Sequence, residues 1–323
     1  MPLPAFLAVT ALAGAASLSG RTQSGSRAST APAQAEAHKA RMVELLRAGR
    51  WRDALELNKA EGKERLDLGG ADLTNAKLFR ALLGRADLTG ASLTGASLTG
   101  ADLTGANLVN GKLLSSSLRG ANLTGASLTD ADLLRANLTN ANLTGADLTR
   151  AWLVHADLTS SNLTGASLSS ANLTGAFLSD ANLIGADLTG TNLTGAGLTK
   201  SNLTGASLLS ANLTGAFLSG ADLTNANLTG ANLFRARPFG ASLSGANLTK
   251  ANLTEANLTD ANLSGANLAD VDLTGAILEG ARLPEGFLAS GTRLDAVPWK
   301  GMPSGWRAIA SPRGARFLPT TQA

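Results

Sequence analysis

The feature that most constrains the fold is a leucine at every fifth residue from Leu68 to Leu288. This series has 45 positions, and Pro238 occupies the single position that lacks leucine. A small residue, in most units alanine, stands two residues before each leucine, as in the unit 121–125 (Ala-Asn-Leu-Thr-Gly). A period of five matches neither the 3.6 residues of a helical turn nor the two-residue alternation of a strand. The chain therefore contains an internal repeat, and its fold has to be worked out from one repeat unit.

Within a unit, the alanine and the leucine are two residues apart, so in extended backbone they point the same way and the residue between them points oppositely. The next two residues, usually Thr and Gly, have to turn the chain, and glycine accepts the positive φ that such turns require. One short extended side followed by one corner, repeated, predicts a coil. Successive coils would pair as parallel β-structure about 4.8 Å apart, with Leu and Ala inside and Asn, Asp, Ser and Thr outside.

The pattern A-(N/D/S)-L-(T/S)-(G/x) resembles the pentapeptide-repeat family over residues 66–290. This resemblance implies an all-β solenoid, a right-handed quadrilateral parallel β-helix in which four repeat units make up each coil. It also implies that the leucine and the small residue face inward. Residues 171–179 recur identically at 211–219, and this displacement equals two such coils.

Residues 1–65 precede the repeat and lack its pattern. Residues 1–34 are interpreted as a signal-like or disordered segment followed by a linker, with a weakly apolar, alanine-rich run at 1–20 that is too short for a membrane span. We expect export if this run acts as a signal peptide, and a cytoplasmic protein otherwise. Apolar spacing in residues 35–65 predicts a short α-helical N-terminal cap on the first coil, or alternatively a partner-binding helix.

The C-terminal residues 291–323 also lack the repeat and are predicted to form an irregular basic cap and tail. Four prolines there disfavour a continued helix or ladder: Pro298, Pro303, Pro312 and Pro319. The aromatic residues in this segment could cover the last coil or form a homodimer contact. Residues 66–290 carry 17 acidic and 12 basic residues, whereas the flanks carry 7 and 15, so the repeat is mildly acidic and its flanks are basic.

Residues suited to catalysis are scarce. The chain has no Cys, and its two histidines, His38 and His155, have no catalytic motif around them. The Ser and Thr hydroxyls are spread over outward positions without a neighbouring base. We therefore expect no enzymatic activity, no cofactor and no metal site.

Three non-enzymatic functions fit a repeat of this kind. The first is a rigid scaffold or protein-interaction surface for an unknown protein partner. The second, implied by the family resemblance, is DNA mimicry that protects or inhibits a type II topoisomerase. Such mimicry requires an acidic stripe that imitates the DNA phosphates. Four acidic residues share one side, but serines interrupt them: Asp67, Asp87, Asp147 and Asp187, with Ser127, Ser167 and Ser207 between or after them. The third is ice binding by threonine arrays. We expect no direct binding to nucleic acid, and the first function is favoured.

Irregular outward positions are the candidate partner-binding residues. Phe177 and Phe217 would lie two coils apart on one side with Gly197 between them, and Trp152 would project from another side. The segment around Pro238 adds further aromatic and basic residues, so that the candidate set is Trp152, Phe177, Phe217, Phe234, Arg235, Arg237 and Phe239. A tolerated packing defect with scattered apolar surface is the alternative interpretation. Asparagines at 20-residue spacing, such as Asn122, Asn142 and Asn162, are predicted to form amide ladders along the coil axis.

Overall fold

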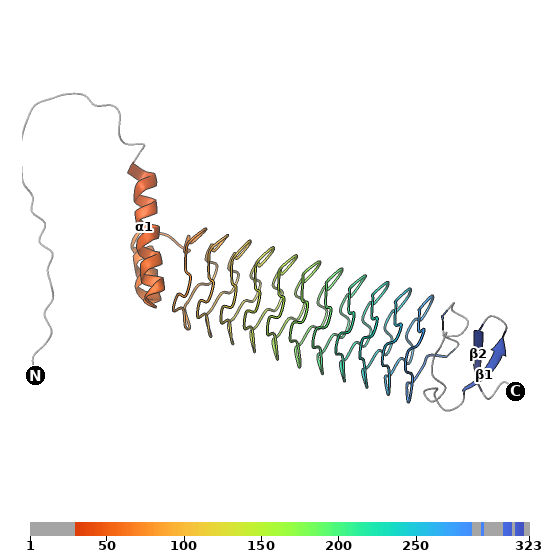
Figure 1. Cartoon of the computed structure of the whole chain (residues 1–323). Helices are drawn as coiled ribbons and strands as arrows, with labels where there is room; N and C mark the ends of the chain where they lie inside the picture. Colours follow the sequence, from red (N-terminus) through yellow and green to blue (C-terminus); the bar gives the residue numbers. More distant parts are fainter. Residues whose placement is uncertain (1–29, 286–291, 294–305, 312–313, 320–323) are drawn as a thin grey trace, which may run out of the picture. The chain divides into compact units, whose positions relative to one another are not determined.

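A computed structural model of the protein describes residues 30–285, 292–293, 306–311 and 314–319. The chain divides into two compact units, residues 1–38 and residues 39–323. The helices are α1 (Thr30–Arg47) and α2 (Trp51–Ala60), and the strands are β1 (Trp306–Ser311) and β2 (Gly314–Pro319). Between α2 and β1 lies a regular stack of coils (Figure 1).

Helix α1 begins at Thr30, within the segment 1–34 where we expected a disordered region and linker, so this expectation is wrong for residues 30–34. The residues there are Thr-Ala-Pro-Ala-Gln, and alanine has the highest helix propensity. Pro32 falls in the first turn, where the backbone amides have no helical acceptor and a missing amide costs little. Gly49, with φ of 78°, lies between the two helices.

The second unit contains the rest of α1, from Lys39 onward, and α2, and both pack on the first coil. Their buried side chains belong to the same hydrophobic cluster as the repeat leucines: Met42, Leu45, Leu46 and Ala54. Lys39 Nζ donates a hydrogen bond to the Gly69 carbonyl. Buried Asn58 donates Nδ2 to the carbonyls of Lys63, at 3.1 Å, and Arg65, at 3.2 Å, where the chain enters the first coil. These helices thus cover core leucines that an uncovered first coil would expose.

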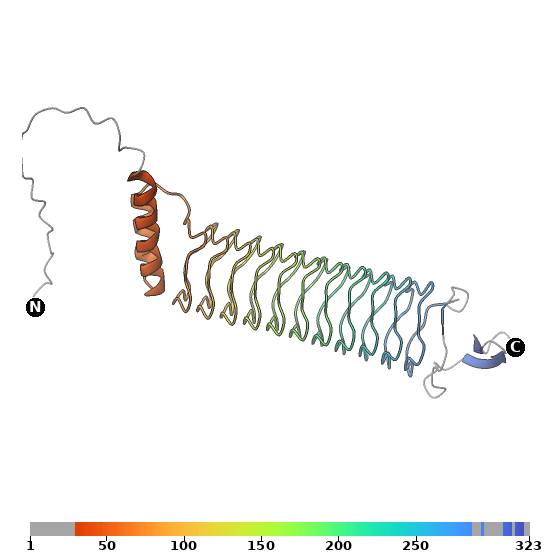
Figure 2. The same ribbon diagram turned by 45° about the horizontal axis from the view of Figure 1, so that its top comes forward.

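Four repeat units complete each coil. The residue between alanine and leucine forms parallel β-bridges with its counterparts four units before and after it, and the series begins with Asp67 and Asp87. Figures 1 and 2 show these coils in register from two directions. Residues 66–285 pair through isolated bridges and contain no extended strand, because a five-residue unit with its own turn leaves one position per side that can bridge both neighbouring coils.

The hydrogen bonds of one unit explain its sequence. Four of the five backbone amides of the unit 122–126 donate to backbone carbonyls at 2.7–3.0 Å: those of Asn122, Leu123, Gly125 and Ala126. The fifth amide, of Thr124, donates to Oδ1 of Asn122 at 3.2 Å, and the Thr124 hydroxyl donates to the same oxygen at 2.6 Å. An Asn or Asp before the leucine therefore accepts the hydrogen bond of the one backbone amide in each unit that has no backbone acceptor.

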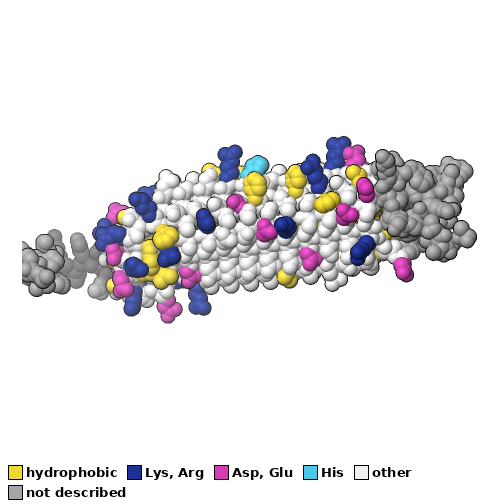
Figure 3. All heavy atoms as spheres, turned by 90° about the horizontal axis from the view of Figure 1, so that it is seen from below, with side chains coloured by type: hydrophobic (Ala, Val, Ile, Leu, Met, Phe, Trp, Pro, Cys, Tyr) yellow, Lys and Arg dark blue, Asp and Glu magenta, His cyan; other side chains and the backbone are white. Residues whose placement is uncertain are grey.

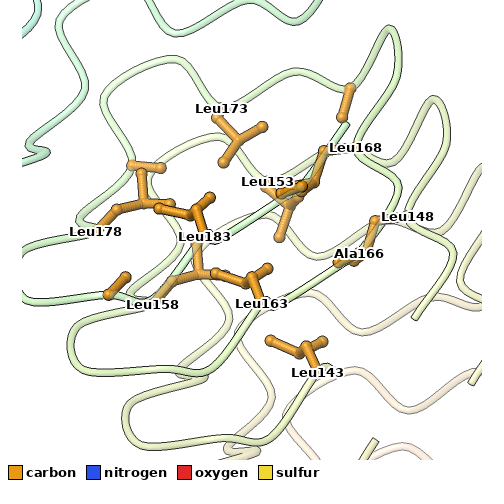
Figure 4. Close-up of a cluster of buried hydrophobic side chains, with 14 of the residues drawn as sticks. Leu143, Leu148, Leu153, Leu158, Leu163, Ala166, Leu168, Leu173, Leu178 and Leu183 are labelled. Atoms are coloured by element: carbon orange, nitrogen blue, oxygen red, sulfur yellow. The ribbon is translucent and has the colours of Figure 1, made fainter. Parts of the chain in front are cut away.

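The interior is filled by leucine and alanine. Leu123, Leu143 and Leu163 are completely buried, and the same holds for nearly all the repeat leucines. Figure 4 shows this arrangement for the leucines from Leu143 to Leu183, whose side chains converge on the axis of the stack. The predicted inward placement is confirmed. Burial of each leucine side chain contributes roughly 1.5–3 kcal/mol to the free energy of folding.

Pro238 takes the place of one core leucine without interrupting the coil. It is buried, and the neighbouring Gly240 amide still donates to the Thr259 carbonyl at 2.8 Å. The bridge that would join Arg237 to Asn257 is missing, because proline has no amide to donate to the Asn257 carbonyl. One bond of the ladder is therefore lost, and the bond from the Leu218 amide to the Arg237 carbonyl is 3.1 Å long, compared with 2.7 Å from Leu198 to Phe217.

The expected amide ladders are wrong for most of the asparagine columns. Asn142 Nδ2 donates to the Thr124 hydroxyl of the preceding coil at 2.9 Å, and Asn162 Nδ2 donates to the Thr144 hydroxyl at 3.0 Å. Since Oδ1 of each asparagine is already engaged by the threonine two residues on, the next amide reaches that threonine's hydroxyl instead. Asn252 Nδ2 donates directly to Asn232 Oδ1 at 3.0 Å, where Phe234 takes the place of the usual threonine. Asn232 Nδ2 lies 3.5 Å from Asn212 Oδ1 and also donates to the Thr214 hydroxyl at 3.0 Å.

The prediction of an irregular segment over 291–323 is wrong for residues 306–311 and 314–319. Strands β1 and β2 pair antiparallel, with Trp306 opposite Pro319 and Ser311 opposite Gly314. Pro312 falls between the two strands in the sequence and Pro319 at the end of the second, so neither removes an amide from inside the ladder. Pro298 and Pro303, and the signal-like run at 1–20, lie outside the described residues.

Candidate functional site

One side of the coil stack carries two exposed phenylalanines in a continuous column. Consecutive parallel bridges join Phe177 to Gly197, Gly197 to Phe217, and Phe217 to Arg237. The side chain of Phe177 is 54% exposed and that of Phe217 is 41% exposed. The Arg237 guanidinium lies over the Phe217 ring, with 4.7 Å from Cζ to the ring centroid. We call these four residues the aromatic column.

Gly197 leaves open space between the two rings. A Cβ atom added at this glycine would contact only the Ala176 carbonyl oxygen, at 3.9 Å. Because successive coils are about 4.8 Å apart, the Phe177 and Phe217 backbones are about 10 Å apart, which leaves room for one side chain of a partner between the rings. The predicted placement of both phenylalanines on one side is confirmed by the bridges.

The remaining candidates near Pro238 lie on the coil that contains Arg237. The Arg235 guanidinium lies 4.7 Å from the centroid of the Phe234 ring, and its Nε donates to Glu255 Oε2 at 2.6 Å. Phe239 is 47% exposed. The contact between Arg237 and Phe217 links this segment to the aromatic column, so six of the seven candidate residues lie within four consecutive coils.

Trp152 belongs to a different side. It is bridged to Asp132 and Asn172, and its side chain is 61% exposed. It lines an open surface pocket of about 540 Å³ together with Asp130, Asp132, Leu134 and Val154. The structure therefore separates Trp152 from the other candidates.

Sequence reasoning missed Leu134 and Val154, which line the pocket beside Trp152. Together with Leu114 they occupy the position after the repeat leucine, where threonine is usual, and backbone hydrogen bonds place the three on consecutive coils. All three are partly exposed. Apolar residues at a threonine position, recurring once per coil, are the signal that would have identified them.

The carboxylates of the repeat are engaged within the coils. The Thr89 hydroxyl and amide both donate to Asp87 and lower the pKa of that carboxyl. Burial raises the pKa of Asp147, but hydrogen bonds from Thr149 and Thr129 outweigh it and the pKa lies below its ordinary value. Asp130 pairs with Arg150, at 2.6 Å between Oδ2 and Nη2. These acids mainly stabilise turns and neighbouring coils.

Acidic side chains form no continuous stripe on the face of the stack that Figure 3 shows, where Asp and Glu are scattered and many lie beside Lys or Arg. The bridges place Asp67 and Asp87 in one column, but Asn107 and Ser127 follow them before Asp147. A column of this kind presents isolated charges, whereas duplex DNA carries a charge about every 1.7 Å.

No group of three or more His, Cys, Asp or Glu side chains that could hold a metal ion occurs among the described residues. His155, at a corner with φ of 55°, lies over Gly175 of the next coil, where an added Cβ would meet the imidazole at 2.7 Å. None of the helices in the described part of the chain is long and apolar enough to cross a membrane.

Comparisons with known proteins match the repeat. The family described as pentapeptide repeats matches in eight copies, over residues 71–110, 116–151, 141–180, 151–190, 176–208, 201–237 and 240–283. No curated protein sequence gives a significant match.

Two of three similar solved structures cover at least 70% of this chain. HetL, a pentapeptide repeat protein involved in heterocyst differentiation regulation from the cyanobacterium Nostoc sp. strain PCC 7120, is 37% identical, with 72% of this chain and 97% of HetL covered and a TM-score of 0.31. Full-length QnrB1, a plasmid-mediated fluoroquinolone resistance protein, is 22% identical, with coverages of 70% and 94% and a TM-score of 0.28. Rfr23, from the cyanobacterium Cyanothece 51142, is 37% identical over 38% of this chain and 64% of its own, with a TM-score of 0.18.

The family match extends over more than half of the chain, and its repeat unit is the one whose hydrogen bonds and buried leucines are described above. The chain belongs to the pentapeptide-repeat family.

Proposed function

We propose that this protein is a non-enzymatic scaffold whose coil stack, a right-handed quadrilateral β-helix, presents the aromatic column to a protein partner. The observation that carries the proposal is the column itself. Phe177 and Phe217 are large apolar side chains exposed at positions where the repeat usually has Asn, Asp or Ser. Aromatic and arginine side chains are the residue types that contribute most to protein–protein binding energy.

Rigidity supports this role. The backbone of each coil is bonded to both of its neighbours, so the two rings and Arg237 are held in fixed positions before a partner arrives. A preorganised surface loses little conformational entropy on binding, which favours affinity. We propose that the partner inserts an apolar side chain over Gly197, between the two rings, and that Phe239 and the Arg235–Phe234 pair extend the contact.

The test is affinity capture with the biotinylated full chain, followed by measurement of the captured partner's affinity for variants. Phe177→Asn and Phe217→Asn restore the residue that the same column carries at Asn137 and Asn257, so the coil should fold unchanged. We expect each substitution to weaken binding about 10- to 30-fold, equivalent to about 1.4–2 kcal/mol. Asn137→Ser, two coils before Phe177, is the matched control. Equal affinity of the double variant and the parent protein would refute the proposal.

Topoisomerase protection by DNA mimicry is the alternative function, and the interrupted acidic column supports it less well than the aromatic column supports protein binding. A supercoiling assay with a type II topoisomerase separates the two. Inhibition or protection at micromolar protein would favour the mimic, and no effect would favour the scaffold. Export through residues 1–20 and homodimer formation through residues 291–323 stay as predictions that secretion and sedimentation experiments can test.

A further inference from the structure

A second surface, distant from the aromatic column in sequence, lies where the turn between the helices meets the first coil. Six residues line a pocket of about 480 Å³: Gly49, Trp51, Arg52, Lys77, Phe79 and Arg80. We call it the basic aromatic pocket. Its volume falls within the range of about 300–1,000 Å³ that is usual for sites that bind small groups. Figure 3 shows a hydrophobic patch bordered by Lys and Arg side chains at this end of the stack.

The floor of the pocket is held in place by a close contact. Gly49 has φ of 78°, and a Cβ atom added there would lie 3.2 Å from the Lys77 carbonyl oxygen and 3.3 Å from the Lys77 Cβ. The turn between the helices therefore approaches the coil backbone as only glycine allows. Trp51, directly after this turn, is partly buried and packs against the hydrophobic core.

The charge of the pocket is positive and unneutralised. Among the described residues, no carboxylate forms an ion pair with Arg52, Lys77 or Arg80. The two neighbouring arginines are neutralised, since Arg47 pairs with Asp72 and Arg50 Nε lies 2.6 Å from Asp53 Oδ2. Three cations without an ion pair in the described part of the chain therefore line the pocket.

Two of these cations lie over aromatic rings. The Arg52 Cζ atom is 4.8 Å from the Trp51 ring centroid, and the Arg80 Cζ atom is 5.1 Å from the Phe79 ring centroid. Arg80 is further restrained by Gly100 of the next coil, where an added Cβ would lie 3.3 Å from its Cγ. A guanidinium group that stacks on an aromatic ring can still donate its outward N–H groups to a carboxylate. The exposed Phe79 ring offers an apolar surface beside them.

We propose that the basic aromatic pocket binds a short acidic segment of a partner protein, in which a bulky apolar side chain packs on Phe79 and flanking carboxylates pair with Arg52, Lys77 and Arg80. Charge complementarity identifies this occupant. Single-stranded nucleic acid fits less well, because it needs a basic groove that follows the backbone over several nucleotides. Here the neighbouring Arg47 and Arg50 already have carboxylate partners, so the unpaired cations of the pocket do not continue through them.

The test is fluorescence polarisation with the full chain and a labelled acetyl-Glu-Asp-Phe-Asp-Glu peptide. Two further peptides separate the apolar from the electrostatic contribution to binding. One has Ala in place of Phe, and the other has Lys in place of every acidic residue. A short oligothymidine probes nucleic acid. We expect saturable binding of the first peptide, weaker binding of the Ala peptide and no binding of the Lys peptide. Oligothymidine binding as tight as that of the acidic peptide would overturn the proposal.

Variants locate the site. Arg80→Glu should weaken the acidic peptide about tenfold or more, because it replaces an attractive contact by a repulsive one. The matched control is Lys200→Glu, which makes a similar change at the same corner six coils later, with φ of 56° compared with 52° at Arg80. Phe79→Thr restores the threonine found at Thr99 and should reduce binding of the Phe peptide to the level of the Ala peptide. Unchanged binding by Arg80→Glu, or equal loss by Lys200→Glu, would refute the assignment.

This inference is independent of the proposed function. Phe177→Asn and Phe217→Asn should bind the acidic peptide as the parent chain does, and Arg80→Glu should retain the partner of the aromatic column. Loss of peptide binding by the phenylalanine variants would show that the peptide occupies the aromatic column, and it would overturn the assignment of the peptide to the basic aromatic pocket.

Discussion

Replacement of Pro238 by leucine should stabilise the coils around it. A leucine amide at this position would donate to the Asn257 carbonyl, as the Leu233 amide does to Asn252 and the Leu243 amide to Asn262, both at 2.7 Å. That bond contributes about 0.5–1.5 kcal/mol, and the additional buried carbon contributes about 0.8 kcal/mol. Loss of the proline ring gives the unfolded chain more freedom, which costs about 0.4–1 kcal/mol. The net gain is about 1 kcal/mol.

Hydrogen exchange measured by mass spectrometry over residues 236–258 is the suitable assay, because solenoid stability is a sum of local contributions. A gain of about 1 kcal/mol corresponds to about fivefold slower exchange. Pro238→Ala restores the amide but empties the core position, and it should be less stable than Pro238→Leu by about 2–3 kcal/mol. Leu258→Pro, one coil later, should accelerate exchange. If Pro238→Leu left exchange over this segment unchanged or faster, the missing bond would not limit local stability and the reasoning would fail.

Two further predictions concern the core and the first coil. Leu163→Asp puts a carboxylate at a fully buried position and should destabilise the protein by about 4 kcal/mol or more. The control Asn162→Asp, one residue away and outward, should change stability by less than about 1 kcal/mol. Thermal melting distinguishes the two variants, and an unchanged melting temperature for Leu163→Asp would contradict the inward placement. Hydrogen bonds from the Thr74 hydroxyl and amide, and then from Arg47, lower the pKa of Asp72 to about 2 from 3.8. A depressed native pKa contributes stability that is present above pH 4 and is lost as the pH falls through about 2. Hydrogen-exchange protection factors in residues 39–47, corrected for the intrinsic pH dependence of amide exchange, should therefore fall over this range, and Asp72→Asn should remove this acid dependence. Identical acid sensitivity of the Asp72→Asn variant would show that another group is responsible.

The coil could be predicted from the sequence because every element of it is local. Alanine and leucine two residues apart define the inward side, and Thr-Gly defines the turn. The four-unit coil implied by the family resemblance then places Phe177, Gly197 and Phe217, at 20-residue spacing, in one column. The asparagine ladders were predicted incorrectly because the choice between two acceptors depends on geometry. In the structure, Oδ1 of Asn142 is already occupied by Thr144, so the next amide donates to the Thr144 hydroxyl.

The basic aromatic pocket could not be predicted from the sequence. Trp51 and Arg52 are distant in the chain from Phe79 and Arg80, and no periodicity relates a helix to a coil. Their proximity depends on the contact between Gly49 and Lys77, which is a matter of how the helices pack on the first coil. Likewise, Arg47 and Arg80 are both basic residues near the first coil, and only the structure shows that the first has a carboxylate partner whereas the second, among the described residues, has none.

The sequence by itself determined the coil of this protein: which side chains face inward, where each unit turns and which outward residues share a column. The inward side and the turn follow from the backbone geometry of one five-residue unit, and the columns follow from the four-unit coil that the family resemblance implies. Only the tertiary structure decided which hydroxyl each asparagine amide meets, which charges are neutralised and where the helices lie on the first coil. Those outcomes depend on contacts between groups distant in the chain, whose distances no local rule specifies.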